Sequence, residues 1–266
     1  MAEIISPMKN VYPLRADGKV IVVTGGYGYL GRAIAESLLF HGAMVIVAAR
    51  DYDKFNHAFE NIAGVDFLNF DISDTGSINA GYKTVIDKYG KIDVLINNAF
   101  YLKGKSPEIL SDDEWDHGIE GVLSSVFKAI REIIPVYQQQ GYGKIINVSS
   151  MYGLVAPDFD IYKDAQEFLN PPHYGAAKAG VLQLTKYYAS YLGKLNIQVN
   201  AVTPGPFPSI LVQENNDFVN ELKSKTCLNR IGSPEDLGGI FTFLASDAAN
   251  FITGQNFIVD GGWTAK

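Results

Sequence analysis

The chain has 266 residues, of which 47% are hydrophobic and 19% are charged, and its net charge is −7 at pH 7. This composition predicts an ordinary soluble globular protein, and the acidic balance argues against a nucleic-acid or anionic-membrane partner. No linker rich in Pro, Ser or charge divides the chain, so we expect one large α/β domain. Cys227 is the only cysteine, which excludes an internal disulfide and fits a reducing, cytoplasmic compartment.

The first fifteen residues mix Glu, Lys, Pro and Ser without a sustained apolar run. This pattern predicts neither a signal peptide nor a membrane span. We expect residues 1–17 to form an N-terminal extension that packs loosely or serves a partner subunit. Residues 18–266 are expected to form the single domain.

Strands and helices alternate along the rest of the chain. Short β-branched or apolar runs, separated by stretches with helical spacing, predict a parallel, doubly wound sheet. Residues 33–40 have helical spacing. Ser111 is suited to cap a long helix that runs toward Gln140 and that Pro135 is expected to end or kink. The predicted strands are 19–24, 44–48, 66–70, 92–96, 144–148, 197–202 and 256–259.

Three glycines, Gly25, Gly28 and Gly31, follow the first predicted strand and open the first predicted helix. Backbone N–H groups at such a helix start can hold a pyrophosphate, with help from the helix dipole. The alternative is a tight turn with close packing of helix on strand. Because the glycines follow a leading strand, the phosphate-binding interpretation is favoured.

Tyr174 and Lys178 are four residues apart, so they lie on one face of a helix. An ammonium close to a phenol favours the phenolate and lowers the phenol pKa from about 10 toward the working range. The pair therefore predicts an acid/base group. The alternative is a core aromatic beside a solvated lysine.

The motifs together resemble those of the short-chain dehydrogenase/reductase family, from Gly18 to about Gly262. The resemblance implies a Rossmann-type fold with strand order 3-2-1-4-5-6-7 and NAD(H) or NADP(H) as cofactor. It also implies assembly into homo-dimers or homo-tetramers through the two long helices and the last strand. The matching motifs are the glycine loop, Asn97-Asn98-Ala99, Asn147-Val-Ser-Ser150, Tyr174 with Lys178, Pro204-Gly205 and Val259-Asp-Gly-Gly262.

By the same resemblance, Ser150 holds the substrate oxygen, Tyr174 moves its proton, and Lys178 lowers the phenol pKa and binds the nicotinamide ribose. Asp71 is expected to accept a hydrogen bond from the adenine amino group, or alternatively to form an Asx turn before Ser73. The implied cofactor-binding residues are Gly25, Tyr27, Gly28, Tyr29, Leu30, Arg50, Asp71, Ile72, Asn98, Ala99, Tyr174, Lys178, Pro204, Gly205 and Phe207.

The residues after the second predicted strand bear on cofactor choice. Ala49 stands where NAD-preferring relatives carry an aspartate, and Arg50 can pair with a 2′-phosphate. We therefore predict NADP(H) over NAD(H). Asp51 weighs against this prediction by its charge, and Arg50 could instead belong to a surface ion pair.

Two positions depart from the family pattern. Tyr29 replaces a glycine of the TGxxxGxG loop, so we expect a differently shaped loop. Val122 stands where the family has a catalytic asparagine, which leaves a proton relay to Ser124, Ser125 or backbone carbonyls. The four histidines have no metal-ligand spacing, and no metal is predicted.

The substrate is less well defined by sequence. The Asn170-Pro-Pro-His-Tyr174 run resembles family members that act on sugars in surface-glycan pathways, which favours a sugar-type alcohol or ketone. The alternatives are a ketoacyl or small-ketone reductase, and a nucleotide-binding regulatory protein with little turnover. Residues 156–173 and 206–228 are expected to select the substrate. In the first segment the groups suited to a polyhydroxylated ring are Asp158, Phe159, Asp160, Tyr162 and Lys163.

Overall fold

A seven-stranded parallel sheet forms the centre of the protein, in the order β3-β2-β1-β4-β5-β6-β7. The computed structural model describes residues 14–104 and 106–266. The predicted sheet and strand order are confirmed, and the ends of the strands differ from the predicted ends by at most two residues. The strands are β1 (Val20–Thr24), β2 (Met44–Ala49), β3 (Val65–Asn69), β4 (Val94–Asn97), β5 (Gly143–Val148), β6 (Ile197–Pro204) and β7 (Asn256–Val259).

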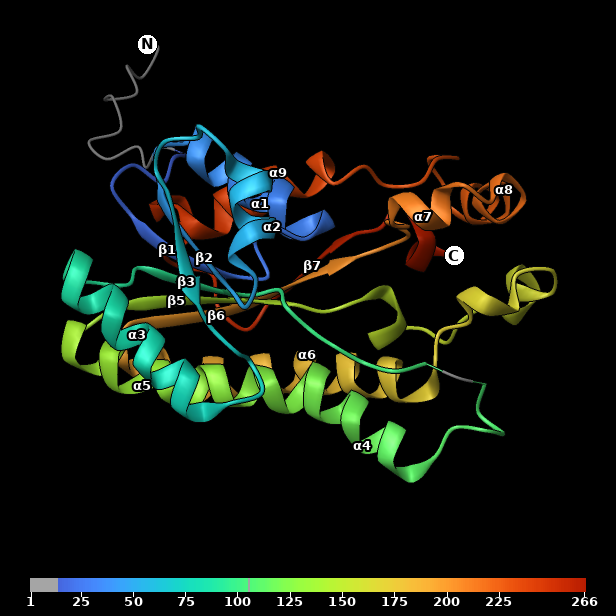
Figure 1. Ribbon diagram of the computed structural model, residues 1–266, viewed down its shortest axis with the longest axis horizontal. Coiled ribbons are helices and arrows are strands. Elements are labelled where there is room, and N and C mark those ends of the chain that lie inside the picture. Colours follow the sequence, from blue (N-terminus) through green and yellow to red (C-terminus); the bar gives the residue numbers. More distant parts are fainter. Residues whose placement is uncertain (1–13, 105) are drawn as a thin grey trace, which may run out of the picture.

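Helices cover both faces of this sheet (Figure 1). One face carries α1 (Tyr29–Phe40), α2 (Tyr52–Phe59) and α9 (Glu235–Ala245). The other carries α3 (Thr75–Tyr89), α5 (Ser125–Gln140) and α6 (Pro172–Leu192), and α4 (Asp112–Ile119) packs on α6. The short α7 (Ile210–Gln213) and α8 (Asn216–Lys225) lie beyond the carboxyl end of β6.

The five inner strands are buried, mainly apolar runs because helices cover both of their faces. In β1 all five residues are buried, and the same holds for the six residues of β5. Strand order reverses between β1 and β4, so their carboxyl ends diverge and leave a crevice. This crevice is where the candidate site lies.

The long helix predicted from Ser111 is present but is built differently. Ser111 and Glu114 form the expected capping box. Of the two outcomes expected for Pro135, an end of the helix does not occur, because α5 continues to Gln140. Pro135 is exposed, so water can satisfy the carbonyl that loses its N–H partner. The regular helix is interrupted instead by a π-helical segment, Glu120–Ser124.

The expectation for the start of the chain falls mainly on residues 1–13, which lie outside the described residues. Ala16 is fully buried, and its N–H donates to the carbonyl of His41 at 2.9 Å. The described chain therefore joins the core from Ala16 onward. Among residues 14–104 and 106–266, no helix has both the length and the apolar character needed to cross a membrane.

Candidate active site

A cavity of about 470 Å³ opens at the carboxyl edge of the sheet, and we call it the main cavity. Its walls come from the segments that follow β1, β2, β4, β5 and β6, together with α6. The sequence-predicted residues that line it are Gly25, Tyr27, Gly28, Tyr29, Leu30, Arg50, Ile72, Asn98, Ala99, Ser150, Tyr174, Lys178, Pro204, Gly205 and Phe207.

The glycine loop has the backbone geometry of an anion site. Gly25 has a φ of 65°, a conformation that favours glycine. A Cβ added at Gly31 would lie 2.3 Å from the carbonyl oxygen of Gly25, so only glycine lets the helix approach the loop. No side chain caps the start of α1 at Gly28. The N–H groups of its first turn therefore remain available to an anion in the main cavity.

Thr24 joins the glycine loop to the end of β4. Its hydroxyl donates to the carbonyl of Ile96 at 3.2 Å and accepts from the N–H groups of Asn98 and Ala99 at 3.0 and 2.9 Å. The Asn98 side chain in turn donates to the carbonyl of Thr24 at 2.9 Å. The two strand ends that border the crevice are thus held at a fixed separation.

Asp71 is not among the residues that line the main cavity, although its neighbours Phe70 and Ile72 are. Its carboxylate accepts from the N–H of Ser73 at 2.9 Å and from the Ser73 hydroxyl at 2.7 Å. The structure thus has the Asx-turn arrangement, which was the alternative expected for this residue.

Ser150, Tyr174 and Lys178 meet at the inner end of the main cavity. The Lys178 Nζ donates to the carbonyl of Val148 at 2.8 Å. It also lies 5.0 Å from the centre of the Phe100 ring and 5.7 Å from that of Tyr174. The tyrosine and lysine therefore share one helix face and one cavity, as their spacing predicts.

Burial dominates the protonation of this group. It lowers the pKa of Lys178 to about 7 and raises the pKa of Tyr174 above its ordinary value, while a hydrogen bond with Ser150 opposes the second shift. Burial is thus the largest cause of the raised phenol pKa, and the expected lowering by Lys178 stays a prediction.

A buried polar chain fixes α6 on the sheet beneath these residues. The Asn97 side chain donates to the side-chain oxygen of Asn147 at 2.8 Å, and Asn147 donates to the Thr185 hydroxyl at 2.9 Å. The Ser149 hydroxyl donates to the carbonyl of Lys178 at 2.9 Å. Since unpaired buried amides are costly, this chain favours one position of α6 along β5.

The start of α6 is fixed by His173, which directly precedes Tyr174. Its ring is fully buried against Gly118 of α4, where an added Cβ would lie 1.9 Å from a ring carbon. Burial lowers the pKa of His173, so the ring is a neutral packing element. In the described part of the chain, no cluster of three His, Cys, Asp or Glu side chains is placed to hold a metal ion.

Val122 is buried within the π-helical segment and offers no polar group. Neither serine proposed as a substitute relay lines the main cavity. The Ser125 hydroxyl donates to the carbonyl of Gly121 at 2.9 Å, and Ser124 hydrogen-bonds Glu120. Of the three expected substitutes, the one in contact with Lys178 is a backbone carbonyl, that of Val148.

A second cavity of about 250 Å³, which we call the aromatic cavity, shares Ser150, Tyr174, Gly205 and Phe207 with the main cavity. Among residues 14–104 and 106–266, no charged side chain lines this cavity. Its remaining lining residues are Met151, Tyr152, Tyr162, Phe168, Asn170, Pro206, Pro208, Val212, Phe218 and Leu222.

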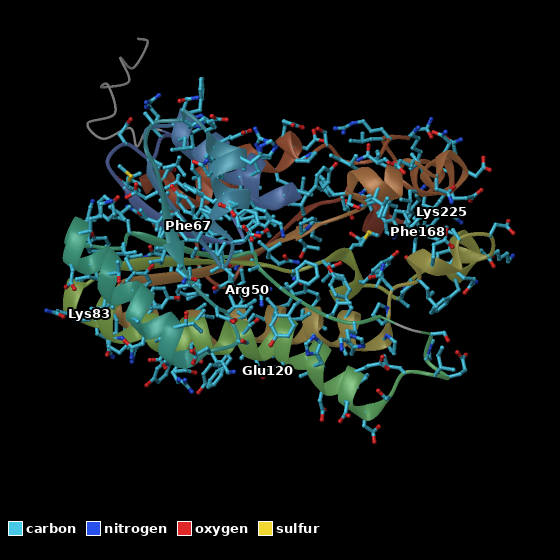
Figure 2. The ribbon with its side chains drawn as sticks, in the orientation of Figure 1. Arg50, Phe67, Lys83, Glu120, Phe168 and Lys225 are labelled. Carbon is cyan, nitrogen blue, oxygen red and sulfur yellow. The ribbon has the colours of Figure 1, made fainter. Side chains whose placement is uncertain are left out.

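The segment 156–171 supplies one wall of the aromatic cavity and α8 supplies another. Phe168 and Phe218 have ring centres 5.0 Å apart, and Lys225 pairs with Asp158 at 2.7 Å. Figure 2 shows Phe168 and Lys225 at the same end of the molecule. These contacts join the two segments that sequence analysis assigned to substrate selection.

Of the five side chains expected to bind a polyhydroxylated substrate ring, only one lines the aromatic cavity. This residue is Tyr162, whose hydroxyl lies 2.7 Å from that of Tyr152 and accepts from the Asn170 side chain at 3.2 Å. Phe159 is 58% exposed, and Asp160 pairs with Lys163 at 2.9 Å. In the 3-10 turn Phe159–Tyr162 the last two side chains are buried and the first two are exposed, which sequence spacing alone did not reveal.

Sequence reasoning did not single out several aromatic residues of the site. Phe100 and Tyr101 line the main cavity, and Phe168 lines the aromatic cavity. The first two directly follow the Asn97-Asn98-Ala99 motif, at the carboxyl end of β4. That position was a usable signal, since ligands bind at strand ends in such sheets.

A third cavity of about 500 Å³, the rim cavity, adjoins the main cavity through Tyr27 and Arg50. Asp51 caps α2 by accepting from the N–H of Lys54 at 3.0 Å, and it pairs with the Lys54 ammonium at 3.2 Å. These contacts hold the pKa of the Asp51 carboxyl below its usual value. Lys54 thus offsets the negative charge of Asp51, while Arg50 forms none of these contacts.

The chain resembles known proteins over most of its length. A family model described as Enoyl-(Acyl carrier protein) reductase matches residues 29–264. The chain is 32% identical to the 3-oxoacyl-[acyl-carrier-protein] reductase of Thermotoga maritima, over 94% of this chain and 99% of that protein. It is 33% identical to the 7alpha-hydroxysteroid dehydrogenase of Bacteroides fragilis, over 94% and 96% respectively.

Solved structures agree with this assignment. The crystal structure of a gluconate 5-dehydrogenase from Burkholderia cenocepacia, in complex with NADP and tartrate, superposes with a TM-score of 0.86. The two sequences are 26% identical, and the match covers 95% of this chain and 98% of that one. The chain belongs to the short-chain dehydrogenase/reductase family of NAD(P)-dependent oxidoreductases.

Proposed function

We propose that this protein interconverts a secondary alcohol and a ketone on an uncharged, ring-shaped, sugar-type substrate, with NADP(H) preferred over NAD(H). The observation that carries the proposal is that Ser150, Tyr174 and Lys178 line the main cavity together and that Ser150 and Tyr174 also line the aromatic cavity. Family membership together with this intact trio favours an enzyme over a regulatory protein with little turnover.

The main cavity fits a dinucleotide. Its uncapped α1 start suits a pyrophosphate, and its inner end lies beside the proposed catalytic trio. A nicotinamide cofactor, when bound, donates or accepts the hydride. Ser150 then holds the substrate oxygen, and Tyr174 gives that oxygen a proton during reduction or removes one during oxidation. Lys178 supplies positive charge close to the tyrosine.

Charge at the rim cavity supports the preference for NADP(H). Arg50 adjoins both cavities, and the charge of Asp51 is offset by Lys54. Arg50→Ser is expected to weaken NADPH binding by roughly tenfold or more, because a charge-assisted hydrogen bond is lost, and to change NADH binding little. Fluorescence titration of both cofactors measures this effect. Tighter binding of NADH than of NADPH by the unaltered protein contradicts the preference.

The lining of the aromatic cavity favours an uncharged substrate. A carboxylate placed there would lose hydration without gaining a charged partner, which is costly. The rings of Phe168 and Phe218 suit the apolar face of a cyclic substrate, while Tyr162 and Asn170 can hydrogen-bond its hydroxyl groups. The solved relative bound to tartrate is named for a sugar acid. The same chemistry on a neutral sugar is the reaction we propose here.

A panel of matched compounds tests this substrate class. We expect neutral keto-sugars and other neutral cyclic ketones to be reduced with kcat/KM at least about tenfold higher than the corresponding keto acids. Phe168→Ala should lower kcat/KM for the preferred compound. Phe159→Ala, in the same segment but exposed, is the matched control and should leave kcat/KM unchanged. Preference for an acetoacetyl thioester would instead support the ketoacyl reductase alternative.

We also propose a homo-dimer or homo-tetramer in a cytoplasmic setting. Exposed apolar and aromatic side chains on the outer faces of the long helices support the oligomer: Phe127 on α5, and Tyr187 and Tyr191 on α6. On β7, Ile258 is exposed as well. The single cysteine remains the support for a reducing compartment.

A further inference from the structure

A hydrogen bond joins Tyr29, which lines the main cavity, to a residue of α7 that is 184 residues away in sequence. The Gln213 side-chain amide, at the end of α7, donates to the Tyr29 hydroxyl at 2.9 Å. Tyr29 is the first residue of α1, lines the main cavity, and stands where the family pattern has a glycine. A glycine there could not make this contact, so the bond is a consequence of that one departure.

The same amide group is anchored at its other hydrogen. Gln213 also donates to the carbonyl of Pro208 at 2.8 Å, so both of its N–H bonds are directed. Pro208 follows Pro204-Gly205 and Phe207, which line the main cavity. The amide therefore has a defined orientation toward Tyr29, and the contact is more than a chance approach of two surface groups.

Besides this hydrogen bond, α7 is held by Val212, which packs against the cluster that includes Phe168 and Phe218. None of its four residues is buried, and Ile210 and Leu211 are 70% and 71% exposed. Within residues 14–104 and 106–266, no other hydrogen bond joins α7 to the glycine loop or α1. In contrast, α8 buries Phe218, Val219 and Leu222. The α8 end of this region is thus fixed by three buried side chains, whereas α7 is held by the partly buried Val212 and by the two hydrogen bonds of the Gln213 side chain.

We propose that Tyr29 and Gln213 form a latch that holds α7 over the bound nicotinamide cofactor, so that cofactor release requires this hydrogen bond to break. The proposal rests on the proposed function, because it assigns the main cavity to the cofactor. Both residues are positioning residues, since they act on the lid rather than on the reacting atoms. Because the latch joins the start of α1 to α7, movement of α7 away from the aromatic cavity also releases its contact with the glycine loop.

The test removes each half of the bond separately and then both halves. In Tyr29→Phe and Gln213→Leu, NADPH is expected to dissociate about threefold to tenfold faster, the range that corresponds to one net hydrogen bond. Stopped-flow displacement followed by cofactor fluorescence measures this rate. The double variant should dissociate no faster than either single variant, because both remove the same bond. Gln198→Leu, with only a local contact to Asn196, is the control.

Hydrogen exchange gives a second readout without cofactor. Faster exchange is expected in the free Tyr29→Phe protein for the amides of residues 213–215, which donate to the carbonyls of Ser209, Leu211 and Val212, with unchanged exchange in α8. Unaltered exchange and unaltered dissociation in both single variants overturn the latch, as does full additivity in the double variant. If the unaltered protein binds neither NADPH nor NADH, the proposed function and cofactor retention both fail. The exchange experiment then still reports whether the contact holds α7.

Discussion

Tyr174→Phe is expected to lower kcat/KM by about 10² to 10⁴-fold while changing the Kd for cofactor by less than about twofold. The substitution removes only the hydroxyl that, in the proposed function, exchanges a proton with the substrate oxygen. The glycine loop, Arg50 and the walls around them are untouched. Steady-state kinetics in both directions, with cofactor titration on the same preparations, measure the two effects separately.

The matched control is Tyr191→Phe, on the same helix. Tyr191 is exposed and far along α6 from the cavity residues, so its hydroxyl should not affect turnover. Retention of most activity in Tyr174→Phe would show that another group moves the proton. A large rise in the cofactor Kd would show that the hydroxyl serves binding instead.

Lys178→Met is expected to lower kcat/KM by at least about 10²-fold, to weaken cofactor binding and to change how stability depends on pH. Burial lowers the Lys178 pKa to about 7 in the folded protein, whereas an exposed lysine in the unfolded chain has a pKa of about 10.4. Between these values the unfolded chain binds a proton that the folded chain lacks. The free energy of unfolding therefore rises with pH in this window.

This contribution is lowest below pH 7, where the folded protein must hold a buried ammonium, and the penalty disappears as pH approaches 10.4. From pH 7 to pH 9 the unaltered protein should gain about 2 kcal/mol of unfolding free energy relative to Lys178→Met. Urea unfolding of both proteins at pH 7, 8 and 9 measures the difference. A constant difference across this range contradicts the lowered pKa.

Lys144→Met separates the effect of a buried lysine on stability from a role in catalysis. Lys144 is buried at the start of β5, donates to the carbonyls of Leu244 and Ser246, and has a pKa lowered to about 8 by burial. Its removal should also alter the dependence of stability on pH. Because Lys144 lies outside the main and aromatic cavities, kcat/KM should remain unchanged.

The fold was predictable because each local pattern agreed with the sheet. β-branched runs such as Val20–Thr24 are buried on both faces, and the glycines that end them mark the turns. Ser150, Tyr174 and Lys178 were predictable as a group because strand ends and helix spacing bring them together in this topology. Fourteen of the fifteen expected cofactor-binding residues line the main cavity, and Asp71 is the exception.

The remaining features depend on contacts between distant segments. From the sequence, Asp71 could equally accept a hydrogen bond from the adenine amino group or form an Asx turn, and in the structure its carboxylate accepts from the N–H of Ser73. The π-helical segment at Glu120–Ser124 has no residue signature, and the Tyr29–Gln213 contact needs the positions of both α1 and α7. The Tyr174 pKa depends on burial, which spacing to Lys178 does not describe.

The hydrogen bonds of Thr24 also bear on the order of events in folding. They join β1 to the end of β4 across 72 to 75 residues. When strands so far apart in sequence pair, the entropy of closing the intervening loop is lost before the stabilising contacts form. The glycine loop therefore cannot take its final shape until the α1–β2–α2–β3–α3 segment has folded back and β4 has docked. Nucleotide binding should thus appear among the last signals during refolding, after helical structure has formed.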